Sequence, residues 1–131
     1  MTFVDTGAWF SAVVPNDPSH SAVVAALSEH GNALLTTDYV LDETLTLLKR
    51  RGETERAIRL GKRLLEENSV RLEWVGQQDA VRAWILFQQH ADKDWSFTDC
   101  ASFAVIQRLS IKTVIALDHH FRQFGALTVL P

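Results

Sequence analysis

The sequence predicts an α/β fold, an α/β/α sandwich around a central, mostly parallel sheet. Short apolar runs alternate with segments of helical periodicity along the whole chain. Glycines stand at the ends of several of these segments, as helix stops and turns require. The 131 residues are 47% hydrophobic, which suffices for one core. We therefore expect a single domain covering residues 1–131.

Five strands are predicted from apolar runs that are bounded by polar or turn residues. This is the pattern of strands buried within a sheet. The runs cover residues 3–5, 33–36, 70–75, 113–117 and 127–130. In a parallel α/β sheet, ligands bind in the crevice outside the carboxyl ends of the strands. Side chains that follow the strands are therefore the first candidates for a functional site.

Helices are predicted in the segments between these strands. They cover residues 19–30, 38–51, 53–68, 77–91, 97–109 and 119–124. In the second, Val40, Thr44, Leu47 and Leu48 follow the spacing of a stripe that faces the sheet. The fifth is apolar on nearly all sides, so we expect it to be buried. Residues 13–19, with two prolines, are predicted to form a loop near the ligand-binding edge.

Composition excludes several classes of protein. The net charge of −3 argues against generic binding of polyanions. The lone cysteine, Cys100, excludes an internal disulfide, fits a reducing, cytoplasmic location and is expected to be buried. No apolar run approaches the ~18 residues of a membrane span, and Asp5 interrupts any signal-peptide pattern.

Four acids stand where the fold would bring carboxylates together. Asp5 ends the first predicted strand and Asp118 ends the fourth, which places both at one edge of the sheet. Glu43 lies on the sheet-facing stripe of its helix, whereas Asp42 is turned about 100° away from it. Asp99 lies in the first turn of the apolar helix, where the helix dipole favours an anion.

A purely structural role is open for Asp99. The segment Ser96-Phe97-Thr98-Asp99 matches the capping box that begins many helices. The two roles are compatible, because a cap fixes the direction in which the chain enters the helix. Separate structural roles for all four acids would require four independent coincidences.

Converging carboxylates need a counterion. At about 4 Å and an effective dielectric near 20, each like-charged pair costs about 4 kcal/mol. Such a cluster must therefore take up protons or bind cations. Oxygen-only ligands suit Mg²⁺ or Mn²⁺ better than zinc. Paired ions of this kind activate water and stabilise the leaving oxygen in phosphodiester hydrolysis.

The chain resembles PIN-domain proteins and, among them, VapC-like toxin ribonucleases. The resemblance rests on the helix with Glu43 and on three motifs: F-V-D-T-G-A-W at 3–9, D-K-D-W-S-F-T-D-C-A-S-F at 92–103 and I-A-L-D-H-H-F-R-Q-F-G at 115–125. It implies an endoribonuclease that cleaves single-stranded RNA with Mg²⁺ or Mn²⁺. It also implies inhibition by a small antitoxin protein and assembly as a homodimer.

The resemblance also assigns residues. It implies that Asp5, Glu43, Asp99 and Asp118 are the catalytic, metal-binding acids, and that Thr6 contacts the substrate. In this chain, two histidines rather than one follow Asp118, which leaves a structural role open for His120. Adjacent helical positions diverge by about 100°, which disfavours His119 and His120 as a metal site of their own. The alternative function is a non-catalytic PIN module that binds RNA or a protein partner.

Basic and aromatic residues allow two interpretations each. Arg56, Arg59 and Arg63 could track RNA phosphates, but acids four residues away favour a solvated face with i,i+4 ion pairs. The cations at 49–51 complement a helix dipole, with phosphate contact as a secondary role.

Trp74 and Trp84 are expected in the core. Trp9 and Trp95 lie near the acids in sequence, where they could stack on a base.

Overall fold

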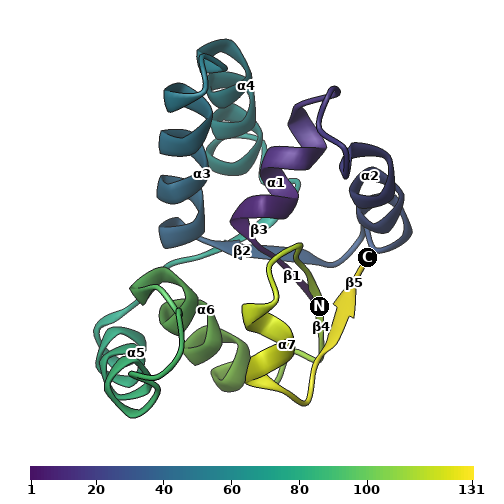
Figure 1. Cartoon of the computed structure of the whole chain (residues 1–131). Helices are drawn as coiled ribbons and strands as arrows, with labels where there is room; N and C mark the ends of the chain where they lie inside the picture. Colours follow the sequence, from purple (N-terminus) through teal and green to yellow (C-terminus); the bar gives the residue numbers. More distant parts are fainter.

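Five parallel strands form one sheet in the order β3-β2-β1-β4-β5 (Figure 1). The computed structural model describes all residues, 1–131. The strands are β1 (Thr2–Val4), β2 (Leu34–Thr37), β3 (Arg71–Glu73), β4 (Thr113–Ile115) and β5 (Thr128–Leu130). The chain runs outward from the central β1 to β2 and β3, then returns to the other side of β1. The order therefore reverses between β1 and β4, which is where α/β sheets open a crevice for ligands.

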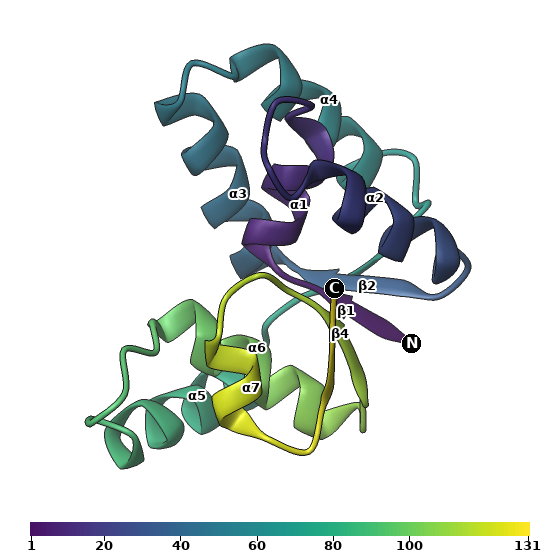
Figure 2. The same ribbon diagram turned by 45° about the vertical axis from the view of Figure 1, so that its right-hand side comes forward.

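Seven helices cover the two faces of this sheet. They are α1 (Thr6–Val13), α2 (His20–Glu29), α3 (Asp38–Arg50), α4 (Thr54–Leu65), α5 (Gln77–Gln89), α6 (Phe97–Arg108) and α7 (His120–Phe124). Figures 1 and 2 show α1–α4 on one face and α5–α7 on the other. The predicted α/β/α sandwich is thereby confirmed. No helix is both long and apolar enough to cross a membrane.

The core joins both helical layers to the central strands. Phe3 in β1, Phe103 in α6 and Phe121 in α7 are fully buried, and the rings of Phe103 and Phe121 have centroids 5.1 Å apart. Helix α6 is buried on nearly all sides, as its apolar sequence predicts. Burial of α6 and α7 against the centre of the sheet fixes the positions of the polar residues at their N-terminal ends.

Helix α1 is absent from the sequence-based prediction. It begins directly after Asp5 and is mostly apolar, with Ala8, Trp9 and Ser11 buried. A short helix of this kind lacks the polar stripe that marks a surface helix in a sequence. Helix α4 is also shorter than predicted and ends at Leu65; Asn68, just beyond it, has a positive φ of 55°.

The tryptophan predictions are partly wrong. Trp74 and Trp84 are 64% and 53% exposed, so neither belongs to the core. Helix α5 buries Asp79, Ala83 and Leu86, which turns Trp84 outward. Trp9 and Trp95 are buried, and their indole N–H groups donate to Thr36 Oγ1 at 3.2 Å and Gln123 Oε1 at 2.9 Å. They are core residues and offer no free face to a base.

Candidate active site

Asp5 and Asp118 meet at the point where the strand order reverses. Asp5 follows the last residue of β1, and its backbone N–H donates to the carbonyl of Ile115 at the end of β4 at 3.0 Å. Asp118 lies three residues after Ile115. Its Oδ1 accepts a hydrogen bond from the backbone N–H of His120 at 2.8 Å, which fixes the turn into α7. Neighbouring parallel strands thus deliver both carboxylates to one edge.

Glu43 and Asp99 reach the same edge from opposite helical layers. Helix α3 is capped by Thr37, whose side chain accepts from Val40 N–H at 3.1 Å. Glu43 is half-buried on the inner stripe of this helix, whereas Asp42 is exposed, as predicted. Asp99 enters with the first turn of α6 on the other face of the sheet.

Asp99 forms the predicted capping box and also lies beside the other three acids. Ser96 Oγ accepts from Asp99 N–H at 3.0 Å, and Asp99 Oδ2 accepts from Ser96 N–H at 2.9 Å, which completes the capping box. The carboxylate also lines the pocket that contains the other three acids. The cap therefore holds Asp99 in a direction that faces the cluster.

All four acids line one pocket of about 490 Å³. Its other polar side chains are Thr6, Asp94, Ser96 and His120. Thr6 was predicted as a site residue, whereas Asp94, which is exposed and follows no strand, was not. Its place in the motif at 92–103, two residues before the Ser96 cap, is the sequence signal that marks Asp94.

The electrostatics of the pocket show that the acids act on one another. Asp5 is 5% exposed. Its pKa rises from 3.8 to about 8, mainly because burial removes water and further because Asp99, Glu43 and Asp118 repel its negative charge, although the backbone N–H of Thr6 opposes the rise. Burial also raises the pKa of Asp99, against the lowering effects of Ser96 N–H and His120.

His120 is a site residue that the sequence analysis left in a structural role. Its Nδ1 lies 2.8 Å from Asp99 Oδ2 and 3.0 Å from Asp118 Oδ1, without the alignment of a regular hydrogen bond to either. The expected divergence of the two histidines is also wrong, because His119 precedes α7 as its N-cap. One ligand atom from each of Asp118, His119 and His120 lies within 4.8 Å of the others.

The residues of the pocket fit a hard divalent cation. Four carboxylates provide oxygen ligands, which Mg²⁺ and Mn²⁺ prefer. The hydroxyl of Thr6 is buried beside Asp5 and has no hydrogen-bond partner within the protein. A buried hydroxyl without a partner is costly, so a ligand in the pocket would satisfy it. A cation would equally offset the repulsion that raises the pKa of Asp5.

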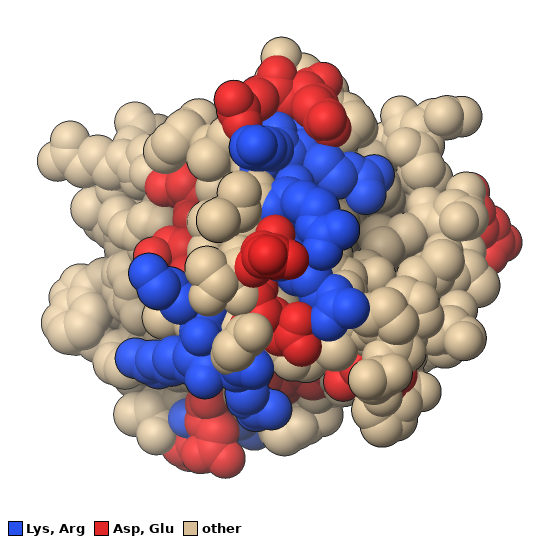
Figure 3. Space-filling model, turned by 90° about the horizontal axis from the view of Figure 1, so that it is seen from above, with Lys and Arg blue, Asp and Glu red and all other residues tan.

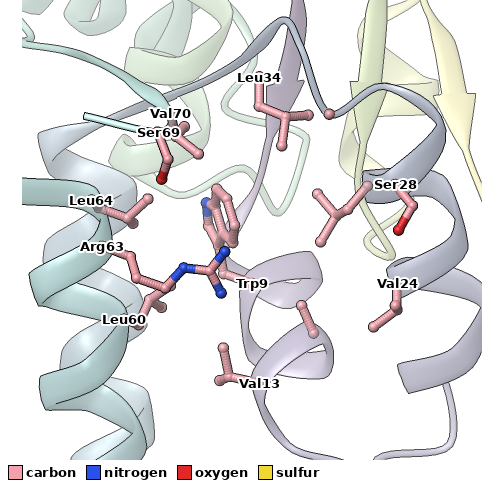
Figure 4. Close-up of a pocket in the computed structure, with 13 residues that line it drawn as sticks. Trp9, Val13, Val24, Ser28, Leu34, Leu60, Arg63, Leu64, Ser69 and Val70 are labelled. Atoms are coloured by element: carbon pink, nitrogen blue, oxygen red, sulfur yellow. The ribbon is translucent and has the colours of Figure 1, made fainter. Parts of the chain in front are cut away.

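A different hollow, of about 420 Å³, lies between α1, α2 and α4. Figure 4 shows its apolar lining, with Trp9, Val13 and Leu60 around the space and Arg63 as the only charged group. It contains no carboxylate.

Lysine and arginine side chains form a band on one face of the molecule, with acids interspersed among them (Figure 3). The predicted ion pairs of Arg59 with Glu55, Lys62 with Glu66 and Arg63 with Glu67 do not form, and Arg56 instead pairs with Glu53 at 2.6 Å. Exposed i,i+4 pairs are worth only about 0.3–0.5 kcal/mol, too little to hold long side chains together. Arg59, Lys62 and Arg63 therefore form no ion pair with an acid of the chain.

The chain belongs to the PIN-domain family, whose model matches residues 2–127. Among its relatives is the 23S rRNA-specific endonuclease VapC20 of Mycobacterium tuberculosis, 31% identical over 131 residues that cover 100% of this chain and 99% of the relative. The crystal structure of M. tuberculosis VapC20, described as a sarcin–ricin loop cleaving toxin, superimposes with a TM-score of 0.93 at 30% identity over 100% of both chains.

More distant structures share the fold. A toxin–antitoxin complex from Klebsiella pneumoniae has a TM-score of 0.71 at 14% identity and covers 100% of this chain and 97% of its own. FitAcB from Neisseria gonorrhoeae has a TM-score of 0.69 at 15% identity, with coverage of 100% and 97%. These likenesses confirm the architecture.

Proposed function

We propose that this protein is an endoribonuclease that hydrolyses phosphodiester bonds of single-stranded RNA with Mg²⁺ or Mn²⁺. One observation carries the proposal: four carboxylates, which follow β1 and β4 or lie on α3 and α6, line one pocket, where burial and the repulsion by the other three raise the pKa of Asp5. Such a cluster has little structural value, because its members repel one another. It gains value when a divalent cation binds.

In this proposal, Asp5, Glu43 and Asp99 hold the metal, and Asp118 assists or holds a second ion. The bound metal supplies an activated water and stabilises the leaving oxygen. The Thr6 hydroxyl donates a hydrogen bond to a phosphate oxygen of the substrate. His120 keeps the carboxylates of Asp99 and Asp118 in a fixed orientation through its two short contacts.

The names of the relatives support a substrate class. VapC20 is named as specific for 23S rRNA and as cleaving the sarcin–ricin loop. We infer that this chain also cleaves an unpaired loop of a structured RNA. An open pocket supports this inference, because an in-line attack on a backbone phosphate requires a strand that can lie across the carboxylates.

We further propose that this chain is the toxin of a toxin–antitoxin pair, inhibited by a small antitoxin protein. The similarity to VapC20 and the fold shared with chains from toxin–antitoxin complexes support this partner. A reading frame for a short DNA-binding protein next to that of the present chain would provide an inexpensive check.

A homodimer is the proposed assembly. Val81, Trp84, Ile85 and Phe87 on α5 are all exposed, and the rings of Trp84 and Phe87 stack with centroids 6.1 Å apart. Large apolar side chains that gather in this way on one helix mark an interaction surface. A second copy of the chain could cover this patch, called here the α5 patch, through a two-fold interface.

The test of the nuclease activity compares two neighbouring acids. A labelled single-stranded RNA and an RNA hairpin are incubated with the parent protein, Glu43→Gln and Asp42→Asn, in Mg²⁺ or in EDTA. We expect Mg²⁺-dependent cleavage that Glu43→Gln lowers at least ~100-fold, since a metal ligand is lost, while Asp42→Asn stays close to the parent. Cleavage that persists in EDTA, or equal rates for both variants, would contradict the proposal.

A further inference from the structure

Two arginines at the C-terminal end of α3 have no anionic partner in the protein. Arg50 is the last residue of the helix and Arg51 is its C-cap. Both are exposed, and neither forms an ion pair or a side-chain hydrogen bond. The guanidinium group of Arg51 lies 5.8 Å from the centre of the Phe10 ring, which restricts its position through a cation–π contact.

Each arginine lines a hollow that borders the acidic pocket. Arg50 lines one of about 370 Å³, together with the hydroxyls of Thr46 and Thr98 and the exposed carboxylate of Asp42. This hollow shares Thr6, Glu43 and Leu47 with the acidic pocket. It therefore continues the acidic pocket in one direction along the surface.

Arg51 lines the other hollow, of about 390 Å³. This one shares Gly7, Leu47 and Leu117 with the acidic pocket. Its one acid, Asp17, accepts hydrogen bonds from Ser11 Oγ at 2.7 Å and from Ser19 N–H at 3.0 Å. These hydrogen bonds hold the Asp17 carboxylate within the local loop. Arg51 is therefore the charged group of this hollow that is free to contact a ligand.

Helix geometry aims both arginines at the site. Glu43, Leu47 and Arg50 recur at i, i+4 and i+7 and share one face of α3, with Arg51 next to it. Helical side chains lean toward the N-terminal end of their helix. Arg50 starts about 10 Å from Glu43 along the axis, and both residues line the same hollow.

We propose that Arg50 and Arg51 bind the RNA phosphates on the two sides of the cleaved bond, one in each hollow. The proposal rests on the proposed nuclease function, since it assigns the path of that substrate. Leu47 lines all three hollows and therefore lies where they meet. A strand laid across Leu47 would place one phosphate over the metal site and neighbouring phosphates on the two guanidinium groups.

The competing explanation is local. Cations at the end of a helix stabilise its dipole, and both arginines stand at the negative end of α3. That role would change the stability of the protein and leave RNA binding alone. The two explanations therefore predict different measurements.

The experiment measures binding of a fluorescent single-stranded RNA of mixed sequence over a range of KCl concentrations, with Mg²⁺ present. Asp99→Asn is the background, so that the RNA stays intact. Arg50→Gln and Arg51→Gln should each reduce the slope of log K against log [KCl] by about 0.7, the value for one lost phosphate contact on a single strand. Arg50→Lys should retain the slope, because Lys also binds phosphate.

Arg59→Gln is the matched control. Arg59 is an exposed arginine of the neighbouring helix α4, but it lines a hollow that shares no residue with the acidic pocket. Its substitution should leave the slope unchanged. Unchanged slopes in Arg50→Gln and Arg51→Gln, with or without a lower Tm, would overturn the proposal, as would an equal loss in Arg59→Gln.

Cleavage by the parent chain is measured separately. Reduced slopes together with an inactive parent would uphold the phosphate contacts and reject the nuclease function. An active parent together with unchanged slopes would uphold the nuclease function and reject the phosphate contacts.

Discussion

The Nδ1 atom of His120 lies 2.8 Å from Oδ2 of Asp99, and this contact joins the start of α7 to the first turn of α6. The same nitrogen lies 3.0 Å from Asp118 Oδ1. One imidazole thus connects two of the proposed ligands, which come from different segments of the chain. Groups that orient metal ligands in this way are often nearly as important as the ligands.

Replacement of His120 should therefore impair catalysis. We expect His120→Ala to lower kcat/KM for RNA cleavage by about 10–100-fold, the usual cost of losing a group that orients metal ligands. His119→Ala serves as the control, because the His119 side chain is 68% exposed and carries no comparable contact with Asp99. Equal effects of the two substitutions would show that the position of His120 is irrelevant.

The cap and the charge of Asp99 can be separated. Ser96→Ala removes one hydrogen bond of the capping box and should lower the free energy of unfolding by about 1 kcal/mol, with cleavage retained well below the Tm. Asp99→Asn keeps an acceptor for Ser96 N–H but loses the charge, so it should fold like the parent and fail to cleave RNA. Urea unfolding and cleavage rates of both variants test this pair of outcomes.

Without metal, the stability of the protein should fall as the pH rises. The pKa of Asp5 moves from 3.8 to about 8 on folding. Between these values the folded state binds a proton that the unfolded state lacks, so the free energy of unfolding decreases with pH and levels off above about pH 8. Urea unfolding in EDTA should show this decline, and Asp5→Asn should show less of it.

Addition of Mg²⁺ should oppose the same decline. Metal binding displaces the proton from Asp5. At a free Mg²⁺ concentration of 100 times Kd, binding adds about 2.7 kcal/mol to the free energy of unfolding. The gain should be larger at pH 8 than at pH 5 and should be lost in Asp5→Asn. A stability that is indifferent to Mg²⁺ at every pH would count against a cation site.

The ion pair of Asp79 with Arg108 should be purely structural. Arg108 Nε and Nη2 donate to the two oxygens of the buried Asp79 at 2.8 and 2.9 Å, joining α6 to α5. Arg108 lowers the pKa of Asp79, so this contribution to stability is present above the unfolded pKa near 3.9 and is lost as the pH falls through the lower folded value. Asp79→Asn should cost about 1–3 kcal/mol, measured by urea unfolding at pH 7, without changing the cleavage rate.

The α5 patch should control the oligomeric state. Trp84→Asp would place a charge within the proposed apolar interface and should convert dimers to monomers in sedimentation equilibrium. Ile58→Asp is the control, because Ile58 is 55% exposed but lies on α4, across the sheet from α5. A parent chain that stays monomeric at high concentration would refute the proposed dimer.

Much of the architecture is predictable from the sequence because its signals are local. Apolar runs and helical stripes locate all five strands and six of the seven helices. The exception, α1, lacks a polar stripe because it is packed on several sides. The core position predicted for Trp84 is wrong for a related reason. An aromatic side chain is apolar, but only packing decides which face of α5 is covered.

The amino-acid sequence by itself determined which four acids are candidates and at which edge of the sheet they lie, because strand ends and helix stripes can be recognised from local sequence patterns. The tertiary structure alone decided that His120 faces Asp99, that Asp94 borders the pocket, and that Arg50 and Arg51 have no anionic partner. These relations depend on how α3, α6 and α7 are positioned around β1 and β4. That arrangement arises from burial of the whole core, so no single segment of the sequence determines it.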